Sequence, residues 1–206
     1  MESKLLSKKT ADTEYEIEPF LKERYSPRIF SDIPVSNADL HTLLEAGRWA
    51  PSSNNLQPWR IIWGIKGSET YQRIFDCLDE FNQSWAGNAP ILWLTLIKKS
   101  LPNGKENFHA LHDLGLFMGN VSVQAQKMGI AIHQMAGVKF KEAKKEFELP
   151  EDYHVVTGVS IGFYGGDVDV LPKELKDLEK SNTRERMPQV EFAFNGNLID
   201  RADVDD

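Results

Sequence analysis

The chain has 206 residues, of which 41% are hydrophobic and 10% are aromatic, and this is enough apolar material for the core of one globular domain. The net charge is −7, from 31 acidic and 24 basic residues with no long basic run, which argues against a surface for nucleic acid. The longest apolar run, at 90–97, is far shorter than the roughly 20 residues that cross a bilayer, so no membrane segment is expected.

The two ends of the chain contain few apolar residues. Residues 1–14 and the acidic residues 196–206 are expected to fray around a single domain over residues 15–195. The N-terminus lacks the apolar core and cleavage site of a secretory signal. The single cysteine, Cys77, cannot form an internal disulfide and has the apolar neighbours of a core helix, so we expect a reducing, cytoplasmic location and no catalytic thiol.

The first well-marked helix follows Ser36, which can cap it together with Asp39. Its apolar residues share one face, and the pattern ends before Pro51, because a proline disfavours helical geometry in the residue before it. A polar loop over 52–58 then leads into a β-branched and aromatic run at 59–63. That run predicts a strand.

The remaining elements are predicted from hydrophobic periodicity. They are a helix at 68–80, a buried strand at 90–98, a long helix at 107–127, a short helix at 139–147 and a strand at 153–163. An alternating stretch at 190–194 predicts a last strand that pairs far away. Helices and strands do not alternate regularly and no glycine-rich phosphate loop occurs, so the predicted fold class is α+β rather than a Rossmann or P-loop fold.

Arg24, Ser26 and Arg28 form the most informative short segment. Pro27 favours an extended backbone before it, and side chains two residues apart in an extended chain point the same way. The two arginines would stand roughly 13 Å apart, which is comparable with the span from the phosphate to the ring of a mononucleotide. Taken alone, these residues also fit a solvated basic surface strand.

Two further polar segments suit a small anionic ligand with a heterocyclic ring. Arg184 and Arg186 lie two residues apart in a non-helical stretch, and a guanidinium can donate two hydrogen bonds to a phosphate while keeping its charge. The loop at 51–59 is dense in hydroxyl and amide groups, which can match donors and acceptors on a ring edge. Taken singly, the arginines also fit a solvated surface and the loop an ordinary turn.

Five short motifs follow one another along the chain. They are R-x-S-x-R-x-F from Arg24, A-P-S-S-x-N-x-Q-P-W from Ala50, Asn82 ahead of Ala89-Pro90, Asp113 with Gly115, and R-x-R-x-P from Arg184. In this order, over about residues 20–194, they resemble the FMN-dependent nitroreductase family. The resemblance implies an α+β homodimer with a central, mostly antiparallel sheet flanked by helices. It also implies a C-terminal strand that extends onto the partner subunit, and two FMN sites in the dimer interface.

The resemblance further implies that the N-terminal and C-terminal arginine segments hold FMN. The first segment comprises Arg24, Tyr25, Ser26 and Arg28. Within it, Arg24 and Ser26 would contact the phosphate and ribityl chain, and Arg28 would lie by N1 and the C2 carbonyl of the ring. Arg184 and Arg186 would complete the phosphate site.

Other residues carried over from the family surround the ring. Asn82 would bond its pyrimidine side, and the backbone amides of Ala136 and Gly137 would lie near N5. The other subunit would supply Pro51, Ser52, Ser53 and Asn55, with Gln57 close to the site.

The implied activity is transfer of electrons from NADH or NADPH to a small electrophile, such as a nitroaromatic or a quinone, by a ping-pong mechanism. No side chain is expected to act as a nucleophile. Arg28 would tune the ring, because reduction adds negative charge around N1 and the C2 carbonyl. The alternatives are an FMN-dependent dehydrogenase or reductive dehalogenase of the same fold, and a non-catalytic flavin-binding protein.

The chain departs from the family pattern at several places. Trp85 stands where some members carry a lysine that contacts FMN, and Ala136 stands where some carry a glutamate. The polar stretch at 100–108 is short, so the helices that shape the substrate pocket in larger members are expected to be abbreviated. His109, His112 and Asp113 mimic metal-ligand spacing only weakly, and no metal site is expected.

Overall fold

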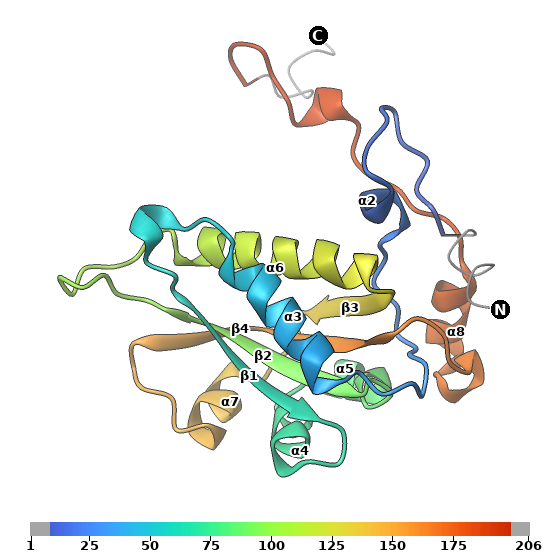
Figure 1. Cartoon of the computed structure of the whole chain (residues 1–206), viewed down its shortest axis with the longest axis horizontal. Helices are drawn as coiled ribbons and strands as arrows, with labels where there is room; N and C mark the ends of the chain where they lie inside the picture. The colour runs from blue at the N-terminus through green and yellow to red at the C-terminus, as the bar shows by residue number, and fades with distance from the viewer. Residues whose placement is uncertain (1–8, 199–206) are drawn as a thin grey trace, which may run out of the picture.

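A central antiparallel sheet organises the computed structural model, which describes residues 9–198. Its strands are β1 (Trp59–Ile65), β2 (Ile91–Lys98), β3 (Ile130–Met135) and β4 (Tyr153–Phe163), in the spatial order β1-β2-β4-β3 (Figure 1). Every neighbouring pair is antiparallel. Together with the helices on both faces, this confirms the predicted α+β class with a mostly antiparallel sheet.

Helices cover both faces of the sheet and divide the core into two layers. One layer lies under α3 (Asn37–Arg48) and α6 (Ala110–Lys127). The other lies under α4 (Glu69–Asp76), α5 (Glu80–Ala86) and α7 (Phe140–Glu146). Figure 1 shows the two groups on opposite sides of the strands.

The apolar run of β2 explains how one strand serves both layers. Ile91 and Trp93 pack in the layer of α3 and α6, whereas Leu92 and Leu94 pack in the layer of α4 and α5. Side chains alternate across a strand, so a strand that is covered on both faces needs apolar residues at every position. The sequence therefore shows an unbroken apolar run there instead of an alternating one.

Two further helices lie beyond the two groups that cover the sheet faces, and the second adds Leu175 to the layer of α4, α5 and α7. They are α2 (Pro19–Glu23), near the N-terminus, and α8 (Lys173–Lys180), which follows β4. Figure 1 shows the segment after α8 running past α2 and away from the sheet. Several of its apolar side chains are exposed, including Met187 at 59% and Phe192 at 59%.

Several sequence predictions are confirmed. Ser36 and Asp39 form the predicted capping box of α3, with the Ser36 hydroxyl accepting from the Asp39 amide and the Asp39 carboxylate accepting from the Ser36 amide. The strand at 153–163 has the predicted bounds, and the short helix at 139–147 is α7. Local signals were sufficient for these elements, because capping and strand periodicity are both short-range patterns.

Other predictions are wrong. Within the single chain, the stretch at 190–194 is no strand but begins in a 3₁₀ turn, Gln189–Glu191, and no strand of the described chain lies beside it. Its extension onto a partner subunit stays a prediction. The predicted helix at 68–80 ends earlier, at Asp76, and Asp79 caps a separate helix, α5. The long helix begins at Ala110 rather than at 107. Four helices and strands were missed altogether, namely α2, α5, β3 and α8.

The predicted peripheral segments are only partly described, since residues 1–8 and 199–206 lie outside the described range. Lys9, inside the segment expected to fray, is buried and lies 3.5 Å from a carboxylate oxygen of Glu179 on α8. Between residues 9 and 198, no helix is long and apolar enough to cross a membrane.

Candidate functional site

The segment of residues 24–28 is non-helical, as predicted, and its first half is held by two distant parts of the chain. The Arg24 carbonyl accepts a hydrogen bond from Arg184 Nη2 at 2.6 Å. The Tyr25 carbonyl accepts one from the Tyr164 hydroxyl at 3.3 Å, and the two tyrosine rings pack 5.0 Å apart. Arg24 Nη1 lies 3.4 Å from the Ser26 hydroxyl, so these two side chains share a side, as the extended pattern predicts.

The second half of the segment is held from β3 and α8. His133 Nδ1 lies 2.9 Å from the Pro27 carbonyl, and the amide of Arg28 donates to Glu179 Oε2 at 3.0 Å. Both contacts join residues more than a hundred positions apart. Because the backbone is held on both sides of Pro27, the fold fixes the direction in which the Arg28 side chain projects from the backbone.

The side chain of Arg28 is half-buried and has no hydrogen-bond partner or ion pair among residues 9–198. Its Nε atom is buried and unpaired. Its guanidinium carbon lies 5.9 Å from the ring centroid of Trp85, which is 1% exposed on α5. A buried guanidinium donor without an acceptor is costly, so this site favours a ligand that offers an acceptor or a negative charge.

Arg184 is more deeply engaged in the fold than the sequence suggested. Its guanidinium donates to the carbonyls of Lys9, Lys22 and Arg24, two of them through Nη1 and one through Nη2. Burial, and then the neighbouring Arg24 and Arg186, lower its pKa. The guanidinium groups of Arg24 and Arg186 therefore lie close enough to repel that of Arg184.

None of the four predicted arginines has an acidic partner in the described part of the chain. The ion pairs found there join other residues, such as Arg73 with Glu146 and Lys176 with Asp169. In a protein of net charge −7, clustered arginines whose guanidinium groups form no ion pair with a carboxylate indicate a site for an anion.

Asn82 and Gly137 also meet in the structure. Asn82 is buried. Its backbone N–H donates to Oδ1 of Asp79, the N-cap of α5, at 2.8 Å, and its side-chain Nδ2 donates to the Gly137 carbonyl at 3.2 Å. A Cβ atom at Gly137 would stand 2.0 Å from Asp79 Oδ2 and 2.3 Å from Asn82 Nδ2, so only glycine fits. Asn82 lies one helical turn before Trp85, which joins this pair to Arg28. Ala136, next to Gly137, is exposed.

The polar loop forms a separate, internally bonded group. Ser52 Oγ accepts from the Gln57 amide at 3.1 Å, and Gln57 Nε2 donates to Asn55 Oδ1 at 3.0 Å. The amide of Ser53 donates to both carboxylate oxygens of Asp113, at 3.1 and 3.2 Å. Asp113 is 1% exposed in the first turn of α6, so the loop is attached to that end of the helix.

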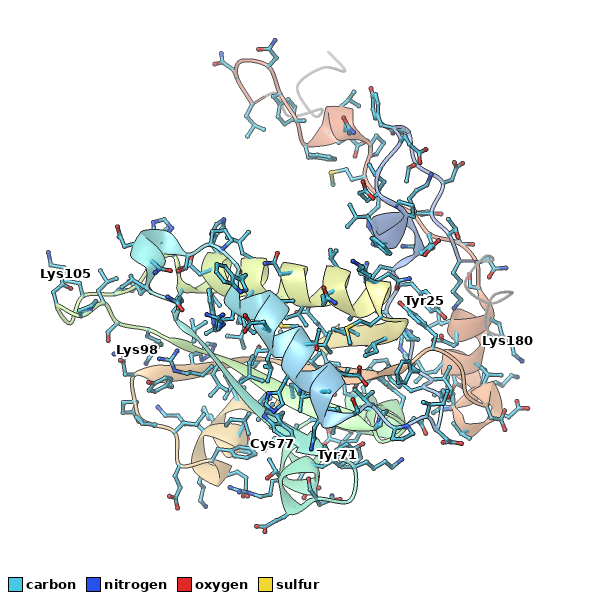
Figure 2. All side chains as sticks on the ribbon, viewed as in Figure 1. Tyr25, Tyr71, Cys77, Lys98, Lys105 and Lys180 are labelled. Atoms are coloured by element: carbon cyan, nitrogen blue, oxygen red, sulfur yellow. The ribbon has the colours of Figure 1, made fainter. Side chains whose placement is uncertain are left out.

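Within one chain, the loop and the arginine segment lie at opposite ends of α6. Asp113 is in the first turn, whereas Gln126, near the last residue, accepts from the Tyr164 hydroxyl beside Tyr25. Thirteen residues at about 1.5 Å each place these ends roughly 20 Å apart. Figure 2 agrees, with Tyr25 on the opposite side of the molecule from Lys105, in the connection between β2 and α6. A single chain therefore does not bring the loop to the arginines.

Sequence reasoning missed His133, Glu179 and Tyr164. His133 lies in β3, which was not predicted, and Glu179 lies in α8, which was also missed. Burial first, with lesser effects of Arg28 and Arg24, lowers the pKa of His133 to about 4 despite the opposing hydrogen bond with the Pro27 carbonyl. No local pattern marks these residues, because each contributes through a contact with a distant segment.

Two sites considered from the sequence have no counterpart in the geometry. Burial raises the pKa of Cys77 to about 11, with a smaller effect of Glu146, so its thiol stays protonated at neutral pH. Among residues 9–198, no group of three His, Cys, Asp or Glu side chains is placed to hold a metal ion.

Comparisons with known proteins agree with the fold and identify the family. The model of the nitroreductase family matches residues 21–76 and 64–163. A Streptomyces coelicolor protein provisionally named NADH dehydrogenase/NAD(P)H nitroreductase is 28% identical over 157 residues, which cover 66% of this chain and 77% of that protein. The FMN reductase [NAD(P)H] of Bacillus subtilis is 25% identical over 160 residues, 69% of this chain and 63% of the reductase.

A solved structure described as an oxidoreductase containing FMN superposes with a TM-score of 0.84 at 31% sequence identity, covering 91% of this chain and 96% of the other. The family match covers well over half of the residues, and it includes the first arginine segment, the polar loop and Asn82. The chain belongs to the nitroreductase family.

Proposed function

We propose that this chain is an FMN-dependent oxidoreductase that takes electrons from NADH or NADPH and reduces a small electrophile, such as a nitroaromatic or a quinone. The observation that carries the proposal is the set of four arginines without acidic partners, at one end of α6. Membership of the nitroreductase family supports it.

The donor set fits both ends of FMN. A phosphate group needs fixed positive charge, and Arg24, Arg184 and Arg186 supply it from two segments that meet. Arg184 donates hydrogen bonds to three backbone carbonyls, one of them that of Arg24. Its main contribution is therefore to hold Arg24 in place and to add positive charge beside the phosphate. Arg28, about 13 Å along an extended chain from Arg24, is left for the ring.

The ring end combines charge with uncharged hydrogen-bonding groups. Asn82 offers an amide that can both donate and accept, and the backbone of Ala136 and Gly137 lies beside it. Bound FMN supplies the redox chemistry, since its ring accepts a hydride from a nicotinamide and passes electrons on. Arg28 stabilises the negative charge that reduction adds at the ring, and no side chain of the chain acts as a nucleophile.

The second half of the site comes from another copy of the chain. The loop residues Pro51, Ser52, Ser53, Asn55 and Gln57 stand roughly 20 Å from the arginine segment of their own chain, so they reach an FMN only on a partner. A twofold homodimer gives two such composite sites. Exposed apolar side chains, such as Trp49 at 73% and Phe108 at 84%, and the projecting C-terminal segment are suited to packing against that partner.

One pocket over the ring serves the nicotinamide and the electrophile in turn, so ping-pong kinetics are expected. The test begins with purified protein, which should be yellow or take up FMN on reconstitution. Anaerobic addition of NADH or NADPH should then bleach the flavin band near 450 nm. Protein that binds no FMN contradicts the proposal. Bound FMN that neither nicotinamide bleaches favours a dehydrogenase, a reductive dehalogenase or a non-catalytic flavin protein.

A further inference from the structure

A chain of stacked side chains supports Arg28 from the interior of the protein. The guanidinium of Arg28 lies over the ring of Trp85, 5.9 Å from its centroid. The ring of Trp85 in turn packs on the imidazole of His133, with centroids 4.5 Å apart and the planes inclined by 39°. The three groups come from the N-terminal segment, α5 and β3.

The same histidine also holds the backbone next to Arg28. His133 Nδ1 lies 2.9 Å from the carbonyl of Pro27, the residue directly before Arg28. A carbonyl can only accept, so Nδ1 carries the hydrogen in this contact. The contacts thus form a closed loop that starts at the Arg28 side chain, passes through Trp85 and His133, and returns to the Arg28 backbone.

Burial and the neighbouring arginines lower the pKa of His133 and so favour a neutral imidazole in this arrangement. The charged groups that act on His133 are Arg28 and Arg24, both cations of the N-terminal segment. From the other elements packed on it, α5 contributes Trp85 and β4 contributes Ser160, which pairs with His133 in the sheet, and neither residue titrates near neutral pH. A protonated His133 would place a second positive charge beside an arginine that already lacks a counter-ion.

We propose that Trp85 and His133 are positioning residues that fix the Arg28 guanidinium for the flavin ring, and so set how strongly this protein favours reduced over oxidised FMN without contacting FMN themselves. The proposal rests on the proposed function, because it assigns Arg28 to the ring. Arg28 is otherwise a long side chain with no hydrogen bond or ion pair within residues 9–198 to hold its guanidinium. The guanidinium instead lies over the face of the Trp85 ring, and this contact is favourable because cations are attracted to the face of an indole ring.

The main experiment compares holoprotein variants by the dissociation constants of oxidised and reduced FMN, measured anaerobically by flavin fluorescence. His133→Phe keeps an aromatic ring under Trp85 but loses the hydrogen bond to Pro27, and Trp85→Phe shrinks the surface beneath Arg28. In both variants we expect the dissociation constant of reduced FMN, divided by that of oxidised FMN, to rise about tenfold. For a two-electron couple, this lowers the midpoint potential by about 30 mV.

The matched control is His154→Phe. His154 is an exposed histidine on β4 that also stacks on an aromatic ring, Phe140, at 5.7 Å. It lies six residues along β4 from Ser160, the partner of His133, which is roughly 20 Å. The same substitution there should leave the ratio of the two constants at the wild-type value.

A double-variant cycle shows whether the effect passes through Arg28. In an Arg28→Ala background, His133→Phe should change the ratio no further. An unchanged ratio in both His133→Phe and Trp85→Phe, or an equal change with and without Arg28, overturns the inference. If His133→Phe does not fold, His133→Asn replaces it and is held to the same outcomes.

The failure of this inference can be told apart from the failure of the proposed function. Wild-type protein that takes up no FMN contradicts the proposed function. Wild-type protein that binds FMN and depends on Arg28, while both positioning variants behave as wild type, contradicts only the inference.

Discussion

The glycine at position 137 gives the sharpest structural prediction. Gly137→Ala places a methyl group 2.0 Å from Asp79 Oδ2 and 2.3 Å from Asn82 Nδ2, both far inside van der Waals contact. Asp79 is the N-cap of α5, and the Gly137 carbonyl accepts from both the Asp79 amide and the Asn82 side chain. The methyl group must therefore push the loop away from the start of the helix that carries Asn82 and Trp85.

The expected cost follows from the contacts that are lost. An N-cap contributes about 1 kcal/mol, and each of the two hydrogen bonds to the Gly137 carbonyl about 1 kcal/mol, so the free energy of unfolding should fall by about 3 kcal/mol. In a protein of this size, a change of 1 kcal/mol moves the melting temperature by about 2–4 °C, so a decrease of about 6–12 °C is expected. The dissociation constant of FMN should rise as well, because Asn82 moves.

Urea unfolding and thermal melting of the apoprotein measure the effect. Asp79→Ser provides the control, because serine caps a helix about as well as aspartate but withdraws the oxygen nearest to the new methyl group. Gly137→Ala should cost clearly less in the Asp79→Ser background than in the wild type. An unchanged melting temperature, or an identical cost in both backgrounds, would refute the steric reasoning.

Three further predictions concern the site. Arg24→Ala and Arg28→Ala should each weaken FMN binding about 10- to 100-fold, since a hydrogen bond to a charged group contributes about 1.5–3 kcal/mol. The control is Arg73→Ala, which removes an arginine that is paired with Glu146, and FMN titrations of this variant should match those of the wild type. The depressed pKa of His133 means that the unfolded chain binds a proton more readily, so stability should fall as pH drops from 6.5 toward 4. Urea unfolding at pH 7 and at pH 5 measures this loss, and about 2 kcal/mol of it should come from His133. Between these two pH values, the free energy of unfolding of His133→Phe should therefore fall by about 2 kcal/mol less than that of the wild type; equal losses in the two proteins would contradict the assignment. Mixing Arg28→Ala subunits with Asn55→Ala subunits should restore about a quarter of the wild-type FMN sites, because half of the dimers are mixed and each contains one intact site; no recovery after subunit exchange would count against the shared site.

Part of this protein could be predicted from its sequence because the signals are local. The Ser36 cap, the unbroken apolar run of β2 and the bounds of β4 each depend on residues a few positions apart. The same holds for the non-helical arginine segment before Pro27. Ordered motifs also indicated the nitroreductase family, which the family model confirms.

Elements without strong local signals could not be predicted correctly from the sequence. The strand β3 has only six residues, and its stability comes from pairing with β4, which is 20 or more residues further along the chain. The stretch at 190–194 alternates like a strand, yet the described chain offers it no neighbour, and a strand cannot form without one. Periodicity reports which side chains could be buried, but not whether a partner is there to bury them.

The sequence by itself determined which side chains could bind an anion, whereas the tertiary structure decided how they are arranged. The tertiary structure brings Arg28 together with Trp85 and His133, Asn82 with Gly137, and Arg184 with the Arg24 carbonyl. It also placed the polar loop at the far end of α6 from the arginines. The physical reason is that a side chain's donors and charge belong to the residue itself, while its neighbours depend on packing between segments that are far apart in the chain.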